Sequence, residues 1–186
     1  RRFSLQLLVF KPNYTYRYHG IPGVDPDPMI TIGTRSQESV VVAKDGCYFH
    51  HDSGFYKYGG GVPQEISKPI SDIIEAIPKS NYTEVYGWKD NDHVYWNIGD
   101  ITASGVTFVN VVVRYTISSE IWTIYSYPNE LKFGINYDTG TSIVPVVGDE
   151  TGKVYQFNSG NTDNGSPINY RMITKWYEIG VIINTK

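Results

Sequence analysis

The sequence predicts an all-β protein, and specifically a β-propeller-like arrangement of short strands. Short β-rich runs separated by turn signals every ~8–12 residues cover most of the chain. Of the 186 residues 15% are aromatic, and the 16 tyrosines suit a pleated, half-buried surface. Eighteen glycines and ten prolines supply frequent turns. A β-sandwich is the alternative arrangement for the same pattern.

The expected strands are bounded by turn residues. Lys11-Pro12-Asn13 separates the first two strands, and Lys44-Asp45-Gly46 forms a hairpin turn, because Asp-Gly supplies the positive φ that a tight turn needs. The strands are expected at residues 5–10, 14–19, 29–33, 39–43, 47–50, 54–58, 84–88, 93–98, 107–116, 121–127, 131–137, 142–147, 153–158 and 168–177, with a last one at 181–184. Residues 20–28 and 159–167 are expected to be loops.

One segment has a helical rather than a strand period. Five isoleucines fall on one helical face at spacings of four, three, one and three residues: Ile66, Ile70, Ile73, Ile74 and Ile77. Pro69 is tolerated in a first helical turn, and Pro78 ends the run. We therefore expect one short helix over residues 68–77, packed against the strands.

Repetition favours the propeller over the sandwich. Aromatic–polar–aromatic strands recur around Tyr56 and Tyr155, with a weaker copy around Tyr115. These tyrosines are 59 and 40 residues apart, close to the ~40–50 residues of a four-stranded blade. The sequence therefore predicts a single propeller-like domain over residues 1–186, with three to four blades. Because closed rings have four or more blades and the chain starts without Met, we expect an incomplete ring or a fragment of a larger propeller.

Three stretches carry a resemblance to a known family. Residues 8–20 run from Leu-Val-Phe-Lys to Tyr-Arg-Tyr-His-Gly, and residues 46–70 run from Gly-Cys-Tyr-Phe through Gly-Phe-Tyr to an Ile-Ser and a short helix. Residues 113–128 contain a strand, a turn, Trp122, a second strand and a proline. Over residues 5–177 the chain resembles the propeller proteins of the head–tail and neck region of tailed phages, similar to packaged-DNA stabilisation proteins.

The resemblance implies a structural protein of the virion without enzymatic activity of its own. It would be located in the virion and act through contacts with other virion proteins and with further copies of itself as a homo-oligomer. The net charge of −3 provides no basic surface for holding a nucleic-acid backbone. We therefore expect at most a passage for DNA, without sequence-specific binding.

The runner-up hypothesis is a carbohydrate-binding or glycan-degrading propeller. Trp88, Trp96 and Trp122 are the candidate aromatic contact residues, although packing between blades is the favoured interpretation of all three. A glycoside hydrolase needs two carboxyl groups in an aromatic-lined cleft. Asp90, Asp92 and Asp100 lie near two of these tryptophans in the sequence and are the candidate carboxylates.

Other catalytic and metal-binding patterns are weak, so no catalytic residue, cofactor or metal is expected. His50-His51-Asp52 is the densest cluster of potential metal ligands, but adjacent histidines on a strand point to opposite faces. Cys47 is the single cysteine, which excludes an intrachain disulfide and favours simple packing. No apolar run approaches the ~18–20 residues of a membrane span.

Overall fold

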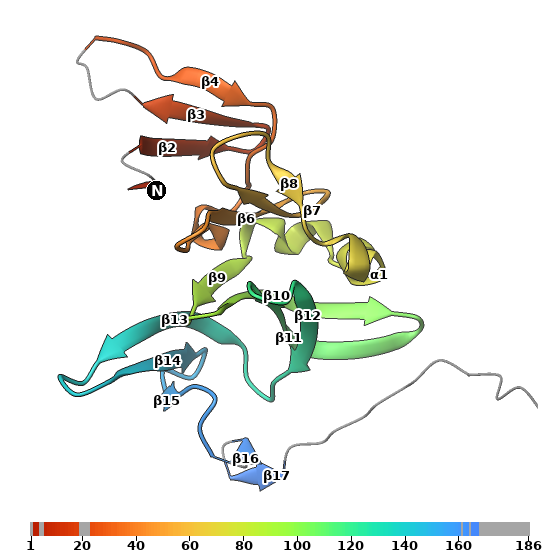
Figure 1. Ribbon diagram of the computed structural model, residues 1–186. Helices are drawn as coiled ribbons and strands as arrows, with labels where there is room; N and C mark the ends of the chain where they lie inside the picture. The colour runs from red at the N-terminus through yellow and green to blue at the C-terminus, as the bar shows by residue number, and fades with distance from the viewer. Residues whose placement is uncertain (1, 4–5, 19–22, 161, 164, 168–186) are drawn as a thin grey trace, which may run out of the picture.

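The computed structural model describes residues 2–3, 6–18, 23–160, 162–163 and 165–167 (Figure 1). Strands predominate in this part of the chain, and the all-β prediction is confirmed. The strands predicted at residues 168–177 and 181–184 lie outside the described residues.

Four antiparallel sheets follow one another in chain order, and within each sheet neighbouring strands are consecutive in the sequence. The first sheet consists of β1 (Arg2–Phe3), β2 (Gln6–Lys11), β3 (Tyr14–Tyr18) and β4 (Asp27–Ile30). The second consists of β5 (Val41–Val42), β6 (Cys47–His51), β7 (Gly54–Tyr58) and β8 (Gln64–Glu65). The third consists of β9 (Tyr86–Lys89), β10 (His93–Ala103), β11 (Val106–Thr116) and β12 (Ile121–Ser126). The fourth consists of β13 (Leu131–Asp138), β14 (Ile143–Asp149) and β15 (Val154–Gln156), and β16 (Thr162–Asp163) and β17 (Ser166–Pro167) form a separate pair.

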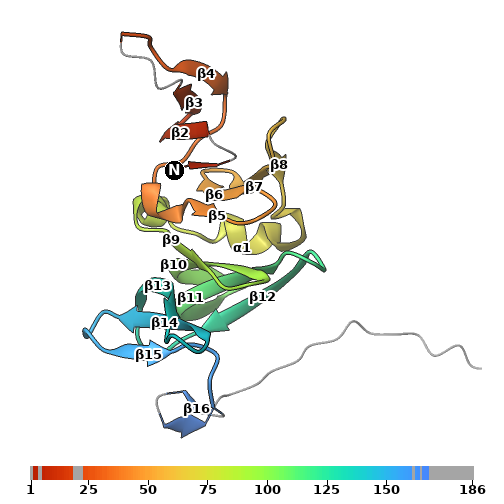
Figure 2. The ribbon, with the colours of Figure 1, turned by 60° about the vertical axis from the view of Figure 1, so that its left-hand side comes forward.

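The sheets are stacked in the order of the chain, from red to blue in Figures 1 and 2. The core accordingly lies in three layers, one between each pair of consecutive sheets. Leu8 and Phe10 of the first sheet pack on Phe49 of the second, with the two phenylalanine rings 5.1 Å apart. Tyr48 and Phe55 of the second sheet pack on the third, and the third packs on the fourth through another buried cluster. Four stacked sheets are found in place of the two sheets of the alternative β-sandwich.

Alternation of side chains explains how the middle sheets bury both faces. In β11, Val111 and Val113 point toward the second sheet, whereas Val112 points toward the fourth. All three side chains are fully buried. This two-sided burial explains why these strands are continuous apolar runs rather than alternating apolar and polar residues.

The predicted helical segment is confirmed. A 3-10 turn at Lys68–Ile70 continues into the short helix α1 (Ser71–Glu75). Its isoleucines join the layer between the second and third sheets; the buried ones are Ile70, Ile73, Ile74 and Ile77. Two further 3-10 turns, η1 (Gln37–Ser39) and η3 (Lys79–Thr83), were not expected from the sequence.

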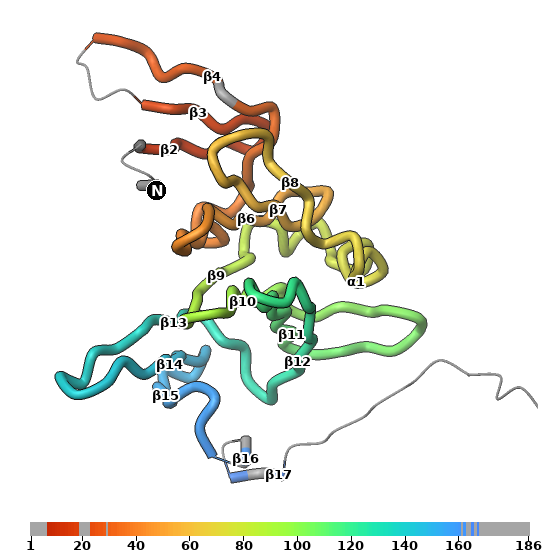
Figure 3. Tube along the Cα trace, viewed as in Figure 1, coloured from red at the N-terminus to blue at the C-terminus, as the bar shows by residue number. Residues whose placement is uncertain are grey.

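The hairpin of β10 and β11 is longer than predicted. Each strand has 11 residues, and the trace in Figure 3 shows the hairpin extending sideways from the stack. The prediction ended the first strand of this hairpin at residue 98, whereas β10 continues to Ala103. Gly99 has a positive φ of 73° at an irregularity in the pairing, where only glycine adopts the backbone without strain.

The first strands of consecutive sheets approach each other closely at two glycines. A Cβ atom at Gly87 of β9 would lie 2.7 Å from Cγ2 of Val41 in β5. A Cβ atom at Gly134 of β13 would lie 2.4 Å from Cγ of Trp88 in β9. Glycine therefore sets the spacing of the second, third and fourth sheets along this edge.

The repeat predicted from tyrosines corresponds to real structural units. Tyr56, Tyr115 and Tyr155 lie on β7, β11 and β15, the third strands of the second, third and fourth sheets. The second strands of the four sheets begin at residues 6, 47, 93 and 143, so successive units start 41, 46 and 50 residues apart.

Candidate functional site

The three candidate tryptophans join the sheets to one another. Trp96 is fully buried and donates a 2.9 Å hydrogen bond from Nε1 to the Ser39 carbonyl oxygen beside the second sheet. Trp122 is half-buried and donates a 2.9 Å hydrogen bond from Nε1 to the Ile66 carbonyl oxygen, also beside the second sheet. Each of these two indoles thus contributes apolar area and one hydrogen bond to the core layer between the second and third sheets.

Trp88 performs the same packing role on the other side of the third sheet. Its ring is buried, stacks on Tyr95 at 5.4 Å and covers Gly134 of the fourth sheet. Because Trp88 and Trp96 are both buried, neither exposes a ring face on which a sugar could stack.

The candidate carboxylates hold turns in place. Asp90 accepts hydrogen bonds from the His93 backbone N–H and the Tyr95 hydroxyl. Burial alone would raise the pKa of Asp90, but the hydrogen bonds from Tyr95 and His93 lower it below its usual range. Asp92 accepts from Ser118, and Asp100 accepts from the Asn110 backbone N–H. These three carboxylates do not line either of the two clefts described below.

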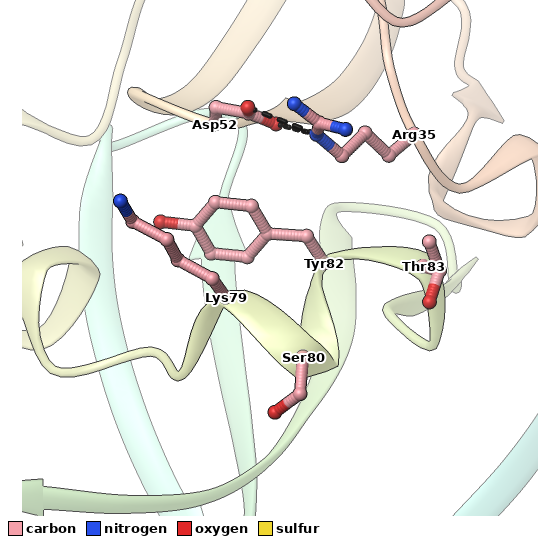
Figure 4. A pocket seen from close by; sticks show the side chains of 6 residues that line it. All are labelled: Arg35, Asp52, Lys79, Ser80, Tyr82 and Thr83. Atoms are coloured by element: carbon pink, nitrogen blue, oxygen red, sulfur yellow. Dashed lines mark hydrogen bonds and ion pairs between the residues drawn. The ribbon is translucent and has the colours of Figure 1, made fainter.

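The first cleft lies beside the second sheet and has a volume of about 680 Å³ (Figure 4). On one side, Arg35 Nε donates to both carboxylate oxygens of Asp52, at 2.8 and 2.9 Å. The hydrogen bond from Arg35 lowers the pKa of Asp52. The opposite side is formed by side chains of η3; they are Lys79, Ser80, Tyr82 and Thr83.

His50 is buried against Tyr82, one of the side chains that line this cleft. Its ring is 1% exposed and meets the Tyr82 ring edge-on at 5.2 Å. Neither ring nitrogen has a hydrogen-bond partner among the described residues. Burial lowers the pKa of His50 to about 4, so the ring is neutral at pH 7.

The cleft does not assemble a recognisable catalytic group. Asp52 is engaged by Arg35, and Ser80 Oγ donates to Asn81 rather than to a base. His51 is hydrogen-bonded to Ser53, away from His50. Within the described part of the chain, no three His, Cys, Asp or Glu side chains are grouped so that they could hold a metal ion.

A second groove of about 750 Å³ lies between the third and fourth sheets. Its aromatic walls include Tyr127, Tyr155 and Phe157, with the rings of Tyr127 and Phe157 6.2 Å apart. Asp149 at its floor accepts hydrogen bonds from the Tyr155 hydroxyl and from Asn129. This carboxylate is therefore occupied by structural contacts.

Among the described residues, no further sheet covers the outer faces of the first and fourth sheets. The upstream end face belongs to the first sheet and consists of Leu7, Val9, Tyr14, Tyr16 and Tyr18, with Lys11 at its edge and the Lys11 ammonium 5.3 Å from the centre of the Tyr16 ring. It lies opposite Leu8 and Phe10, which point into the core. Leu7 is 43% exposed and Val9 is 37% exposed.

The downstream end face belongs to the fourth sheet and carries the amide of Gln156 together with six side chains that are mainly apolar: Phe133, Ile135, Tyr137, Val144, Val146 and Val154. Gly134 and Val147 on the same strands point the other way, toward the third sheet. Ile135 is 60% exposed and Val154 is 61% exposed. None of the six side chains of this face carries a charge.

The sequence analysis did not single out these two faces, although a signal was present. Residues 7–10 are Leu-Leu-Val-Phe, an apolar run without alternation. Such a run is typical of a strand that is covered on both sides. Among the residues that the structure describes, another sheet covers only one side of β2.

No protein-family model matches the chain, and no curated protein sequence matches it either. Among the helices of the described residues, none has the length and apolar character needed to cross a membrane.

Proposed function

We propose that this chain is an arc of β-propeller blades that serves as a structural part of a phage virion, in the neck or tail. Three features support the propeller. Each sheet is an antiparallel meander in chain order. The units start 41 to 50 residues apart, which is close to the ~40–50 residues of a propeller blade. In addition, β9 lies beside both β5 and β13, as the innermost strands of neighbouring blades do around a common axis.

The observation that carries the structural role is the apolar character of both end faces. Stacked repeats that end in solvent need polar outer surfaces on their terminal units. Here the terminal units expose Leu7 and Val9 at one end and Ile135 and Val154 at the other. A contiguous apolar surface of this kind marks a site of protein–protein contact. The protein therefore acts through its ends, as a building block does.

The glycan alternative has less support. It relied on Trp88, Trp96 and Trp122 as stacking platforms, and the first two are buried between sheets. Trp122 is half-buried, and its ring packs against Phe55 and Trp96. It also relied on carboxylates such as Asp90, which accepts hydrogen bonds within its own turn.

The test is incorporation into particles. Phage particles whose genome encodes this chain are purified on a density gradient, and their proteins are quantified by mass spectrometry. We expect the chain in the particles at a fixed number of copies. An Ile135→Lys variant supplied in trans should be incorporated at least about tenfold less, because a buried unpaired charge opposes the contact.

Val62→Lys is the matched control. Val62 is 89% exposed and lies in the loop between β7 and β8 of the second sheet, outside the strands that form the two end faces, so this variant should be incorporated normally. Absence of the wild-type chain from purified particles would refute the virion assignment. Equal loss of both lysine variants would show that the end face has no special role.

A further inference from the structure

The three internal layers of the stack share one polarity. In each layer, the downstream face of one sheet packs on the upstream face of the next sheet along the chain. Leu8 and Phe10 belong to the downstream face of the first sheet, and Phe49 belongs to the upstream face of the second. The two surfaces left over are consequently not alike. The upstream end face and the downstream end face are the two halves of one more layer of the same kind.

The chemistry of the two end faces suits such a layer. The downstream end face is uncharged and offers aliphatic side chains such as Ile135 beside the aromatic rings of Phe133 and Tyr137. The upstream end face offers Leu7 and Val9 beside three tyrosines, and the cation of Lys11 lies at the edge over the Tyr16 ring. Internal layers combine the same residue types, as with Leu8, Phe49 and Tyr58. Tyrosine hydroxyls can reach the edge of a layer while the rings pack.

The ends of one chain do not satisfy each other. The first and fourth sheets lie at opposite ends of the stack (Figures 1 and 2), and both end faces are exposed. A contact between unlike faces of two copies is heterologous, and it either closes a ring or continues as a filament. Closed propellers have about four to eight blades. Apart from the β16–β17 pair, the described residues of each chain form four stacked sheets, so two copies give eight of these sheets, the number at the upper end of that range.

Building on the proposed structural role, we infer that the partner of both end faces is a second copy of this chain. The downstream end face of each copy packs on the upstream end face of the other. Two head-to-tail contacts then close an eight-sheet ring with twofold symmetry.

The test is the oligomeric state of the purified full chain, measured by sedimentation equilibrium and light scattering. The wild type should have twice the chain mass of 21.1 kDa. Val9→Lys places a charge in the upstream end face, and Ile135→Lys places one in the downstream end face. Each variant alone should be monomeric, with dimerisation weakened on the order of 100-fold or more, because both layers of the ring receive an unpaired charge. Val62→Lys should remain dimeric.

Mixing the two variants tests the head-to-tail arrangement. In a mixed pair, the unaltered downstream end face of the Val9→Lys chain meets the unaltered upstream end face of the Ile135→Lys chain. One layer of the ring is therefore intact, and the mixture should recover a species of dimer mass that neither variant forms alone. Circular dichroism confirms folding, and Leu7→Lys with Val154→Lys provides a second pair of variants at the same faces.

Three results would overturn the inference. They are a monomeric wild type, a dimer that only one of the two substitutions disrupts, and a filament in place of a discrete dimer. Disruption by one substitution alone would indicate contact between like faces. A monomeric chain that is still incorporated into particles would leave the structural role standing while excluding the second copy as the partner.

Discussion

Replacing Gly134 with alanine tests the close packing of the third and fourth sheets. The added Cβ would lie 2.4 Å from Cγ, 2.5 Å from Cδ1 and 2.8 Å from Cδ2 of Trp88. Ordinary contacts of a Cβ begin at 3.4 Å, so the indole or the strand must retreat by about 1 Å. The ring has little room to do so, because Trp88 is buried and stacks on Tyr95 at an interplanar angle of 9°.

The expected cost follows from this geometry. Overpacking a dense interior costs about 1–3 kcal/mol, which lowers the folding equilibrium constant roughly 5- to 150-fold. Without the clash the sign would be opposite, because alanine in the middle of a strand is favoured over glycine by roughly 0.5–1 kcal/mol. The direction of the change therefore distinguishes tight packing at Gly134 from a loosely covered strand.

The assay is urea unfolding followed by far-ultraviolet circular dichroism. Gly61→Ala is the matched control, because a Cβ at Gly61 meets no atom within 4 Å and its backbone lies outside the left-handed region. That control should be neutral or stabilised by up to about 1 kcal/mol. Adding Trp88→Leu to Gly134→Ala should make the alanine less costly than it is beside the intact indole. If Gly134→Ala is as stable as Gly61→Ala, the close approach of the two sheets is refuted.

Two further predictions concern buried groups. His50 has its pKa lowered to about 4 by burial, so the unfolded chain binds the proton more strongly. The free energy of unfolding should fall by about 3 kcal/mol as the pH drops from 6.5 to 4. His50→Phe should remove this pH dependence in urea titrations. Parallel pH profiles for the wild type and the variant would contradict the prediction. Trp122→Phe removes the part-buried hydrogen bond to the Ile66 carbonyl oxygen. It should lower the free energy of unfolding by about 1 kcal/mol. Trp96→Phe also leaves the buried Ser39 carbonyl unpaired, and should cost about 2 kcal/mol or more in the same titration; the reverse order would contradict the ranking.

Local signals in the sequence predicted the individual elements well. Asp45-Gly46 marked the turn between β5 and β6, and the isoleucine period marked the helical segment that ends before Pro78. These signals succeed because turn chemistry and side-chain period depend on neighbours in the sequence. Tyr56 and Tyr155 likewise marked equivalent strands, because each unit repeats the same local pattern.

Contacts between sheets were beyond the reach of the sequence. Nothing near Gly134 in the chain indicates that Trp88, which lies 46 residues earlier, will cover it. Trp96 was considered as a ligand platform because exposure cannot be read from residue type alone. The predicted strand ended at residue 98 and missed the rest of β10. Gly99 gives no warning of this, since glycine is frequent both in turns and at irregularities within strands.

The order of the stack has a consequence for biosynthesis. Each sheet contacts the sheets just before and just after it in the chain, so every core layer is built from segments that leave the ribosome in succession. Folding can therefore advance with translation, one unit at a time, without waiting for a distant segment. During this growth, the face that the newest sheet has just exposed is the one on which the next sheet will settle. A nascent chain is therefore never left with more than two sheet faces open at one time.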